Sequence, residues 1–469
     1  MEKKAGLKED AMNYIVNYDG LTDHGYQKER KVALDCLNVA LDAASTYQGT
    51  KRIVRRDTEN LYVGEKCIPF AEIGHIYIVG AGKGTFPIVK ALDEILGNRI
   101  SKGVVALKEE AEGLSNPTVE LIHASHPVPD EKSLEAGRKI AALAGQLTEK
   151  DVVFACITGG CSSLMVLPPE EIPFEDIVEL GKELMKCGAP ISEMNAVRKH
   201  TCRLKGGGLL NMLKKAQVIT LTQDTRPENL PWPDPMLADP STFADAIRML
   251  KKYEMWDLVS EHIRRYLLTG QSRPEMETLK SVEGIQHKIY DVGNQRSACE
   301  AAQAYAERLG YHSMILSTKI EGEAREAGCV FAGIAKEISL YNRPVAVPCV
   351  VISAGETRVT IKGSCGNGGP NQEFVSGFAE NIRGYASIVC ASIDSEGTDG
   401  PTAIAGGITD EMTILTAEKG GIDIFEELRE HNSSYVLTST GDAIYTVPTG
   451  TNVVNLRVMV IGERKDGAD

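Results

Sequence analysis

The sequence predicts an α/β protein with two domains. Short apolar runs rich in β-branched residues recur along the chain with helical stretches between them, which is typical of a parallel sheet covered on both faces. The chain has 469 residues, 42% of them hydrophobic, which is more than a single domain usually contains. A charged segment without a clear buried strand, residues 253–296, interrupts the pattern. We place the domain boundary there and expect domains of residues 1–255 and 256–469.

Six strands are expected from the apolar runs. They cover residues 75–80, 152–157, 218–222, 348–354, 387–392 and 457–461. Ligands in parallel sheets bind beyond the carboxyl ends of the strands. Candidate functional residues are therefore expected in the loops that follow these strands.

The overall composition limits the kinds of partner. The formal net charge of −14 argues against nucleic acid and against an anionic membrane surface, because both attract clustered Lys and Arg. The charged N-terminus lacks the apolar core of a signal peptide, and no apolar run approaches the ~18 residues of a membrane span. A cytoplasmic protein is expected. Its eleven cysteines are dispersed and show no metal-ligand spacing, so we expect reduced, mostly buried thiols.

A glycine-rich turn follows the first expected strand and contains Gly82, Lys83 and Gly84. Glycines allow a ligand to approach the backbone closely, and an ammonium group can neutralise a phosphate. The turn matches neither the complete dinucleotide fingerprint nor the P-loop spacing. A tight turn with a solvated lysine is the alternative interpretation.

A second turn of this kind follows the strand at 152–157 and carries Gly159, Gly160, Ser162 and Ser163. Its N–H and hydroxyl groups could donate hydrogen bonds to a phosphate or a sugar acid. Ordinary capping of a helix by either serine explains the same residues. No arrangement of His and Asp marks either serine as a nucleophile.

A basic helical stretch, residues 191–210, ends in three glycines. Asn195, Arg198 and Lys199 share one helical face, whereas Glu193 lies off it, and Lys205 directly precedes the glycines. A basic stripe in an acidic protein suits an anionic ligand. A solvated cationic face is the alternative.

Acidic residues lie between glycines near the C-terminal strands. They are Glu356, Glu373, Asp394, Glu396 and Asp399. Carboxylates in such loops could bind Mg²⁺ or act as a catalytic base, although each also fits an ordinary turn.

These motifs, in this order, resemble the glycerate 2-kinase family whose members end in a MOFRL domain. Among the segments that carry the resemblance are "GAGKGTFP", "SHPVPDEKSLEAG", "TGGCSSL", "GAPISEMNAVRKHTCRLKGG", "SAGETRVTIKG", "GNGGPNQE", "GTDGPT" and "PTGTNVVNL". The resemblance implies a Rossmann-like N-terminal domain with a parallel sheet, and a smaller C-terminal α/β domain with the MOFRL region at about 345–462. It also implies an active site in the interdomain cleft and Mg²⁺-dependent transfer of the ATP γ-phosphoryl group to the 2-hydroxyl of D-glycerate or a hydroxyl of a related sugar acid. If the protein assembles, a homodimer is expected.

The resemblance also implies roles for individual residues. Lys83 stands at the family's catalytic lysine, and we assign hydroxyl activation or metal binding to Asp399 or Glu356 as a hypothesis; no metal ligands are implied securely. The residues expected to bind substrate or phosphate are Gly82, Gly84, Gly159, Gly160, Ser162, Ser163, Glu193, Asn195, Arg198, Lys199, Lys205, Asp224, Asn371 and Glu373.

The glycine loop at 363–373 departs from the family pattern. Asn367 and Pro370 occupy two positions where the family usually has arginines. Because loss of one transition-state arginine can cost ~10³–10⁵ in rate, a kinase would need a replacement cation, such as Arg226 or Arg358. Two alternatives follow: a regulatory protein that binds a sugar acid or nucleotide, and an isomerase or lyase in which Lys83 and a carboxylate move protons. A dehydrogenase ranks low because the dinucleotide fingerprint is incomplete.

Overall fold

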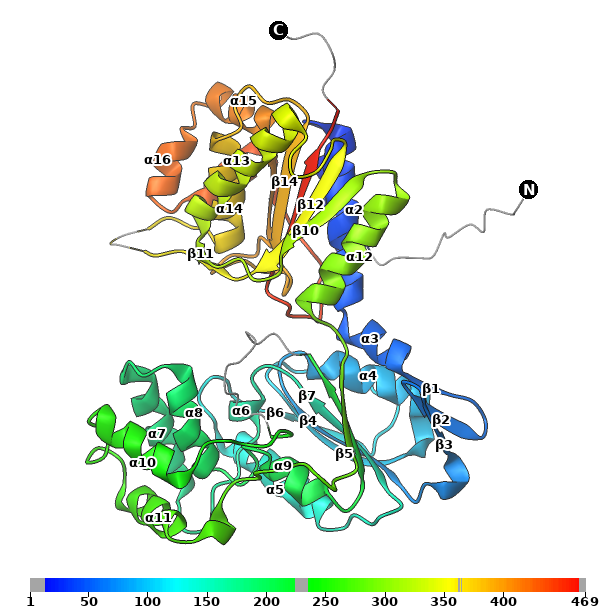
Figure 1. Ribbon diagram of the computed structural model, residues 1–469, viewed down its shortest axis with the longest axis vertical. Coiled ribbons are helices and arrows are strands. Elements are labelled where there is room, and N and C mark those ends of the chain that lie inside the picture. Colours follow the sequence, from blue (N-terminus) through cyan, green and yellow to red (C-terminus); the bar gives the residue numbers. More distant parts are fainter. Residues whose placement is uncertain (1–12, 224–234, 362, 364, 464–469) are drawn as a thin grey trace. The chain divides into compact units, whose positions relative to one another are not determined.

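The computed structural model describes residues 13–223, 235–361, 363 and 365–463. The chain forms two compact units, each with its own sheet and core (Figure 1). The first unit comprises residues 46–292, and the second unit comprises residues 1–45 together with residues 293–469. Both units are of the α/β class, as the sequence predicted.

The first unit is built on a six-stranded sheet in which every neighbouring pair is parallel. In spatial order its strands are β6 (Val119–His123), β5 (Ile100–Leu107), β4 (Ile76–Ala81), β7 (Val152–Ile157), β8 (Gln217–Thr222) and β9 (His287–Asp291). Numbered within the sheet, this order is 3-2-1-4-5-6, which is the Rossmann order. Strand order reverses between β4 and β7, and such switch points are where these sheets bind ligands.

The two faces of this sheet are buried by different elements. Val79 and Val104 pack with α5 and with the helices that follow it, whereas Ile78 and Val105 pack with α4 and a small antiparallel sheet. The α-helices are α3 (Thr46–Ile53), α4 (Thr85–Leu96), α5 (Glu131–Ala144), α6 (Cys161–Leu164), α7 (Phe174–Lys186), α8 (Ile191–His200), α9 (Gly208–Leu213), α10 (Phe243–Lys252) and α11 (Glu261–Gln271), and the small sheet contains β1 (Val54–Arg56), β2 (Asn60–Val63) and β3 (Lys66–Pro69). Side chains alternate across a strand, so consecutive apolar residues supply both cores.

The second unit has a mixed sheet. In spatial order its strands are β10 (His312–Ser317), β12 (Cys349–Gly355), β17 (Asn455–Ile461), β14 (Ile388–Asp394), β15 (Gly406–Asp410) and β16 (Ala443–Ile444). Only β10 and β12 run parallel, and the other neighbouring pairs are antiparallel. Apolar runs alone did not distinguish this sheet from the parallel one, because both are covered on two faces.

Helices cover both faces of the mixed sheet (Figure 1). α2 and α12 share one core with its strands, and α13 and α14 share the other. The helices and short strands of this unit are α1 (Tyr18–Thr22), α2 (Gln27–Ala44), α12 (Gln295–Arg308), α13 (Ala324–Tyr341), α14 (Pro370–Glu380), α15 (Glu411–Lys419), α16 (Ile424–Arg429), α17 (Ser433–Thr440), β11 (Gly322–Glu323) and β13 (Thr357–Arg358). The N-terminal helix α2 therefore belongs to the same core as the C-terminal strand β17.

The boundary between the units differs from the one expected near residue 255. The charged segment contains α11 and the edge strand β9, which pairs with β8 from Val218 to Thr222. β9 has no fully buried residue, so it lacks the apolar run that reveals an inner strand. The N-terminal residues also lie in the other unit, because Leu34, Leu37 and Leu41 of α2 pack into its core.

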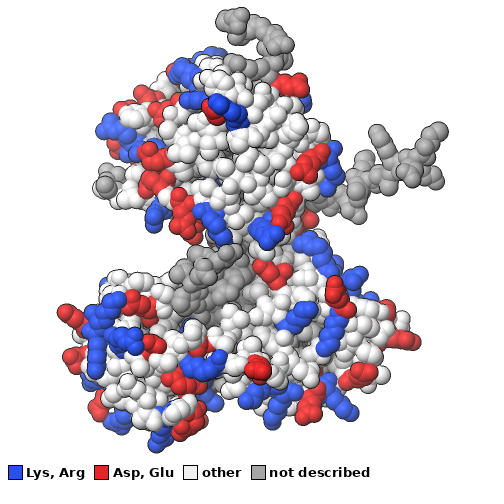
Figure 2. All heavy atoms as spheres, viewed as in Figure 1, with Lys and Arg blue, Asp and Glu red and all other residues white. Residues whose placement is uncertain are grey.

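Other expectations from composition can be compared with the structure. The six predicted strands correspond to β4, β7, β8, β12, β14 and β17 to within two residues at their ends. All eleven cysteines are free and most are buried, as predicted. In the parts of the chain that are described, no helix is long and apolar enough to span a membrane. On the face shown in Figure 2, acidic and basic side chains are interspersed on both units.

Candidate functional site

The loops after β4 and β7 are bound to each other at the switch point of the first unit. The Lys83 N–H donates to the Gly159 carbonyl (2.8 Å), and the Gly84 N–H donates to Thr158 Oγ1 (3.0 Å). Gly82 has φ +141°, and a Cβ at this position would lie 2.1 Å from Thr158 Oγ1. Gly82 is thus required for the close packing of the two loops, since any larger residue would push them apart.

Three residues from different loops meet above this turn. Gly160 has φ +90°, and a Cβ there would lie 3.3 Å from His126 Nε2 and 3.4 Å from Lys83 Cγ. Lys83 is exposed and His126 half-buried. His126 was not among the predicted site residues, although it lies in the loop after β6, within the family-like segment "SHPVPDEKSLEAG".

The two serines of the second turn differ in their surroundings. Ser163 lies inside the short helix α6 and donates to the Gly160 carbonyl (3.2 Å), whereas the N-cap is Gly160 and no described side chain caps this helix, so the capping alternative is wrong. The Ser162 hydroxyl is buried and has no hydrogen-bond partner among the described residues. An unpaired buried hydroxyl costs free energy, so Ser162 is the better candidate to contact a ligand.

Two members of the basic stretch are neutralised by carboxylates. Glu193 pairs with Lys252 (2.8 Å) on the outer side of α8. Lys199 is buried and pairs with Asp239 (2.8 Å), which also accepts a hydrogen bond from Ser241. Burial alone would raise the pKa of Asp239, but the hydrogen bond from Lys199 holds that pKa below its usual range. Each of these side chains already has a partner of opposite charge, so neither Glu193 nor Lys199 needs a ligand to neutralise it.

Arg198 and Lys205 have no such partners. Lys205 is only 8% exposed, and Arg198 is half-buried. Burial lowers the pKa of both side chains, and Arg198 lowers that of Lys205 further. The other ionisable groups that act on them are the thiols of Cys161, Cys187 and Cys202; no carboxylate among the described residues does so. Among the described residues, these two cations therefore have each other and three thiols as ionisable neighbours, and no carboxylate.

Asn195, on the same helix as Arg198, is 2% exposed. Two further predicted residues cannot be compared: Asp224 and Arg226 lie outside the described residues. Arg358, the other candidate replacement cation, is exposed at the end of β13.

In the second unit, Asp399 is completely buried and binds the start of α14. Its carboxylate accepts hydrogen bonds from the N–H groups of Asn371 (3.1 Å) and Gln372 (3.0 Å) and from both side-chain amides. Burial raises the pKa of Asp399, while these hydrogen bonds oppose the rise. Because both carboxylate oxygens are engaged, this geometry suits a residue that positions the glycine loop and α14.

The glycine loop is also held by residues 430–434. The Gly366 N–H donates to the Glu430 carbonyl (2.7 Å), and the Ser434 N–H donates to the Asn367 carbonyl (3.0 Å). Glu373, which is 2% exposed, pairs with His431 (2.7 Å), and burial raises the pKa of Glu373. Asn371 and Glu373 are therefore internal supports of the loop.

A cluster of carboxylates surrounds the end of β14. Burial raises the pKa of Asp394 to about 7, and the nearby charges of Asp399, Glu396 and Glu356 add to the rise. Glu356 is exposed. No group of three or more His, Cys, Asp or Glu side chains in the described residues is arranged as a complete metal site.

Arg457 lies under this cluster and was missed by the sequence analysis, because it sits in the apolar run of β17. It is 1% exposed, donates to Thr357 Oγ1 (2.8 Å) and lies 4.7 Å from the centre of the Phe374 ring. Burial lowers the pKa of Arg457 to about 10. Its Nε and the hydroxyl of Ser353 are buried without hydrogen-bond partners in the described residues.

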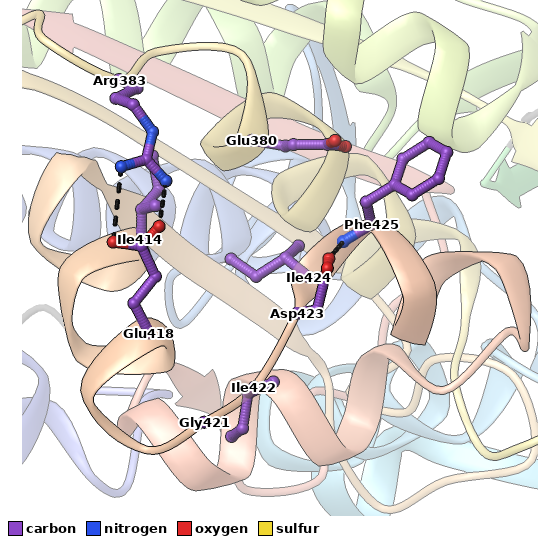
Figure 3. A pocket seen from close by; sticks show the side chains of 9 residues that line it. All are labelled: Glu380, Arg383, Ile414, Glu418, Gly421, Ile422, Asp423, Ile424 and Phe425. Carbon is purple, nitrogen blue, oxygen red and sulfur yellow. Dashed lines mark hydrogen bonds and ion pairs between the residues drawn. The ribbon is translucent and has the colours of Figure 1, made fainter.

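A cavity of about 500 Å³ lies elsewhere in the second unit, next to α14, α15 and α16 (Figure 3). Arg383 and Glu418 form an ion pair on one side of it, and Asp423 accepts from the Phe425 N–H on another. None of the predicted site residues lines this cavity.

A parallel sheet in the Rossmann order, with two glycine-containing loops joined at its switch point, defines a Rossmann-like α/β protein. Comparison with known proteins narrows this class. The MOFRL family matches residues 349–455, and a domain described only as one of unknown function matches residues 32–268. The chain belongs to the glycerate 2-kinase family and is a homologue of these phosphotransferases, which confirms the resemblance found in the sequence.

The similarity to known proteins extends over most of the chain. The chain is 35% identical over 438 residues to the glycerate 2-kinase of Pyrococcus horikoshii, covering 93% of this chain and 98% of the relative. It is 35% identical over 420 residues to the D-glycerate 2-kinase of Thermotoga maritima, covering 87% and 97%. The crystal structure of a glycerate kinase from Thermotoga maritima is similar with a TM-score of 0.82 and 33% identity, covering 92% of this chain and 99% of that chain.

Proposed function

We propose that this protein transfers the γ-phosphoryl group of ATP to the 2-hydroxyl of D-glycerate or of a closely related sugar acid. The names of its relatives supply the reaction class. The observation that carries the proposal is the pair Arg198 and Lys205, whose buried charges lack a carboxylate among the described residues. Such charges are costly unless a ligand neutralises them, and both glycerate and ATP are anions.

Each cation has a proposed part in this reaction. Arg198 and Lys205, with Asn195, bind the carboxylate or phosphate of the ligand. Lys83, which is exposed in the loop after β4, compensates the charge of the transferring phosphoryl group. Phosphoryl transfer depends mainly on such positioning and charge compensation. These four residues could therefore provide the positioning and charge compensation that we propose for the first unit.

Mg²⁺ is expected with ATP, and we propose Asp394 and Glu356 as the carboxylates that would hold it, although the described residues contain no group of three or more possible ligands. Mg²⁺ in kinases is usually held by one or two carboxylates and the phosphates of the substrate. Asp394 and Glu356 are oxygen donors whose mutual repulsion contributes to the raised pKa of Asp394, and a divalent cation would relieve that repulsion. When bound, Mg²⁺ would neutralise charge on the β- and γ-phosphates.

The raised pKa of Asp394 predicts a dependence of stability on pH. In the folded protein the Asp394 carboxyl group keeps its proton up to about pH 7. In the unfolded chain the same group loses its proton near the ordinary pKa of ~3.9. The unfolded state therefore binds fewer protons between these values, and this group makes stability fall as pH rises, by at most ~1.4 kcal/mol per pH unit. Asp394→Asn should remove this contribution in urea unfolding experiments between pH 5 and pH 7.5.

Mg²⁺ should restore part of the wild-type stability at pH 7.5 and have less effect on Asp394→Asn. Glu65→Gln, at an exposed position of the first unit, serves as the control and should keep the wild-type pH slope. Equal slopes in wild type and Asp394→Asn would contradict the prediction.

The proposed reaction is tested by ADP release coupled to a spectrophotometric assay, with ATP, Mg²⁺ and a panel of C3–C6 sugar acids. We expect turnover with D-glycerate or a close relative, and a loss of about 10²-fold or more for Lys83→Ala, because the transition state loses a compensating charge. The variant should keep the thermal stability of the wild type, since Lys83 is exposed. Wild-type protein without turnover on any acid would refute the kinase proposal.

One observation favours a second function, a regulatory protein that binds a sugar acid or nucleotide without phosphorylating it. Asn367 and Pro370 stand where the family's glycine loop usually has two arginines, so this loop lacks both cations. The same experiments distinguish the two functions. Ligand-induced thermal stabilisation without ADP release would support the regulatory function.

A further inference from the structure

His126 is carried to the switch point from a more distant strand. It follows β6, which is separated from β4 by β5, so the loop extends across about two strand spacings, or roughly 10 Å. Its ring lies over Gly160, with Cδ2 and Nε2 at 3.1 and 3.3 Å from the position of a Cβ on that residue. The stem of Lys83 flanks the same position at 3.4 Å. The imidazole and the catalytic lysine candidate therefore lie beside the same turn.

The loop that carries His126 is fixed on both sides of the residue. Before it, the Ala124 N–H donates to the Leu107 carbonyl at the end of β5 (2.9 Å). The Ser125 hydroxyl donates to Asp130 (2.8 Å), and Asp130 in turn caps the first turn of α5 through Ser133. A ring held by a capped helix and a neighbouring strand is positioned before any ligand arrives, which is what a reacting group requires.

In the loops after β4, β6 and β7, the role of accepting a proton has no residue assigned to it so far. The charged groups of these loops are Lys83 and Asp130. Asp130 is used by Ser125 and the α5 cap, and Lys83 is a cation. Among the described residues of the loops after β4, β6 and β7, His126 is thus the side chain suited to accept a proton near neutral pH.

We propose that His126 is the general base of the phosphoryl transfer, a role that rests on the proposed kinase function. Nε2 accepts the proton of the attacking hydroxyl group while that oxygen forms a bond to the γ-phosphorus. The bond between this phosphorus and the β–γ bridging oxygen breaks, and its electron pair leaves with ADP. His126 then releases the proton to solvent. Lys83, whose stem lies beside the same turn, compensates the phosphoryl charge.

The test compares His126→Gln with His123→Gln. His123 is exposed at the end of β6, three residues away, and is a matched control. Loss of a general base typically costs ~10²–10⁴ in rate, so kcat for His126→Gln should fall by that factor while the KM for ATP changes little. The acidic limb of the wild-type pH profile should also disappear in His126→Gln, and His123→Gln should behave as wild type.

Chemical rescue separates a base from a structural residue. His126→Gly should recover part of the lost kcat when free imidazole is added, and thermal unfolding should show that both His126 variants remain folded. Wild-type turnover with an unchanged His126→Gln rate, or an inactive folded His126→Gly that imidazole cannot rescue, would overturn the role of His126 and leave the kinase proposal standing. Absence of turnover in the wild type itself would overturn both.

Discussion

Lys205→Met is expected to lower kcat/KM strongly and to make the ligand-free protein more stable. Methionine fills a similar volume and removes a buried charge that has Arg198 beside it and no carboxylate among the described residues. Removing such a charge should raise the free energy of unfolding by about 1–3 kcal/mol. For a unit of this size, each kcal/mol should raise Tm by roughly 2–4 °C. The same change removes a ligand for the anion, so kcat/KM should fall by about 10–150-fold, as for a lost hydrogen bond to a charged group of about 1.5–3 kcal/mol.

The control for this prediction is Lys199→Met. Lys199 is equally buried but pairs with Asp239 at 2.8 Å. Its removal leaves a buried carboxylate without its cation, which costs about 3–5 kcal/mol. The two lysine variants should therefore change Tm in opposite directions in calorimetry. Sulfate or phosphate should stabilise the wild type and fail to stabilise Lys205→Met. Equal destabilisation by both substitutions would refute the anion site.

Arg30→Met is expected to be the most destabilising single change in the second unit. Arg30 is completely buried and pairs with Asp410 (2.6 Å) and Asp442 (2.8 Å). Asp410 also caps α15 by accepting from the Met412 N–H. Removal of the guanidinium leaves the buried carboxylate of Asp410 without its cation and that of Asp442 with His24 (3.0 Å), so the unit should lose about 3–5 kcal/mol of unfolding free energy, measured by denaturant unfolding.

Lys31→Met is the matched control, because Lys31 follows Arg30 on α2 and is exposed. Its unfolding free energy should stay within about 0.5 kcal/mol of the wild type. A loss for Arg30→Met of the same size as for Lys31→Met would show that the buried pairs contribute nothing to the attachment of α2.

Much of the fold could be predicted from local patterns. The inner strands are continuous apolar runs because helices or other strands cover both faces of each sheet. The edge strand β9 was missed for the opposite reason: His287 to Asp291 include no fully buried residue. The attachment of α2 to the C-terminal unit was also missed, since Arg30 meets its partners about 380 and 412 residues away in the chain.

The residues of the candidate site likewise divide into those that local sequence patterns predicted and those that only the structure revealed. The sequence by itself determined the α/β class, the family and the turns that contain Lys83 and Gly160, because turns and apolar runs are encoded by neighbouring residues. It could not separate Lys199 from Lys205, because the difference is the carboxylate of Asp239, which lies 40 residues from Lys199 in the chain. Only the tertiary structure decided which of the two lysines is paired with a carboxylate among the described residues, and only strand order brought His126 next to Gly160. Electrostatic pairing and strand order join distant segments, and no local pattern encodes them.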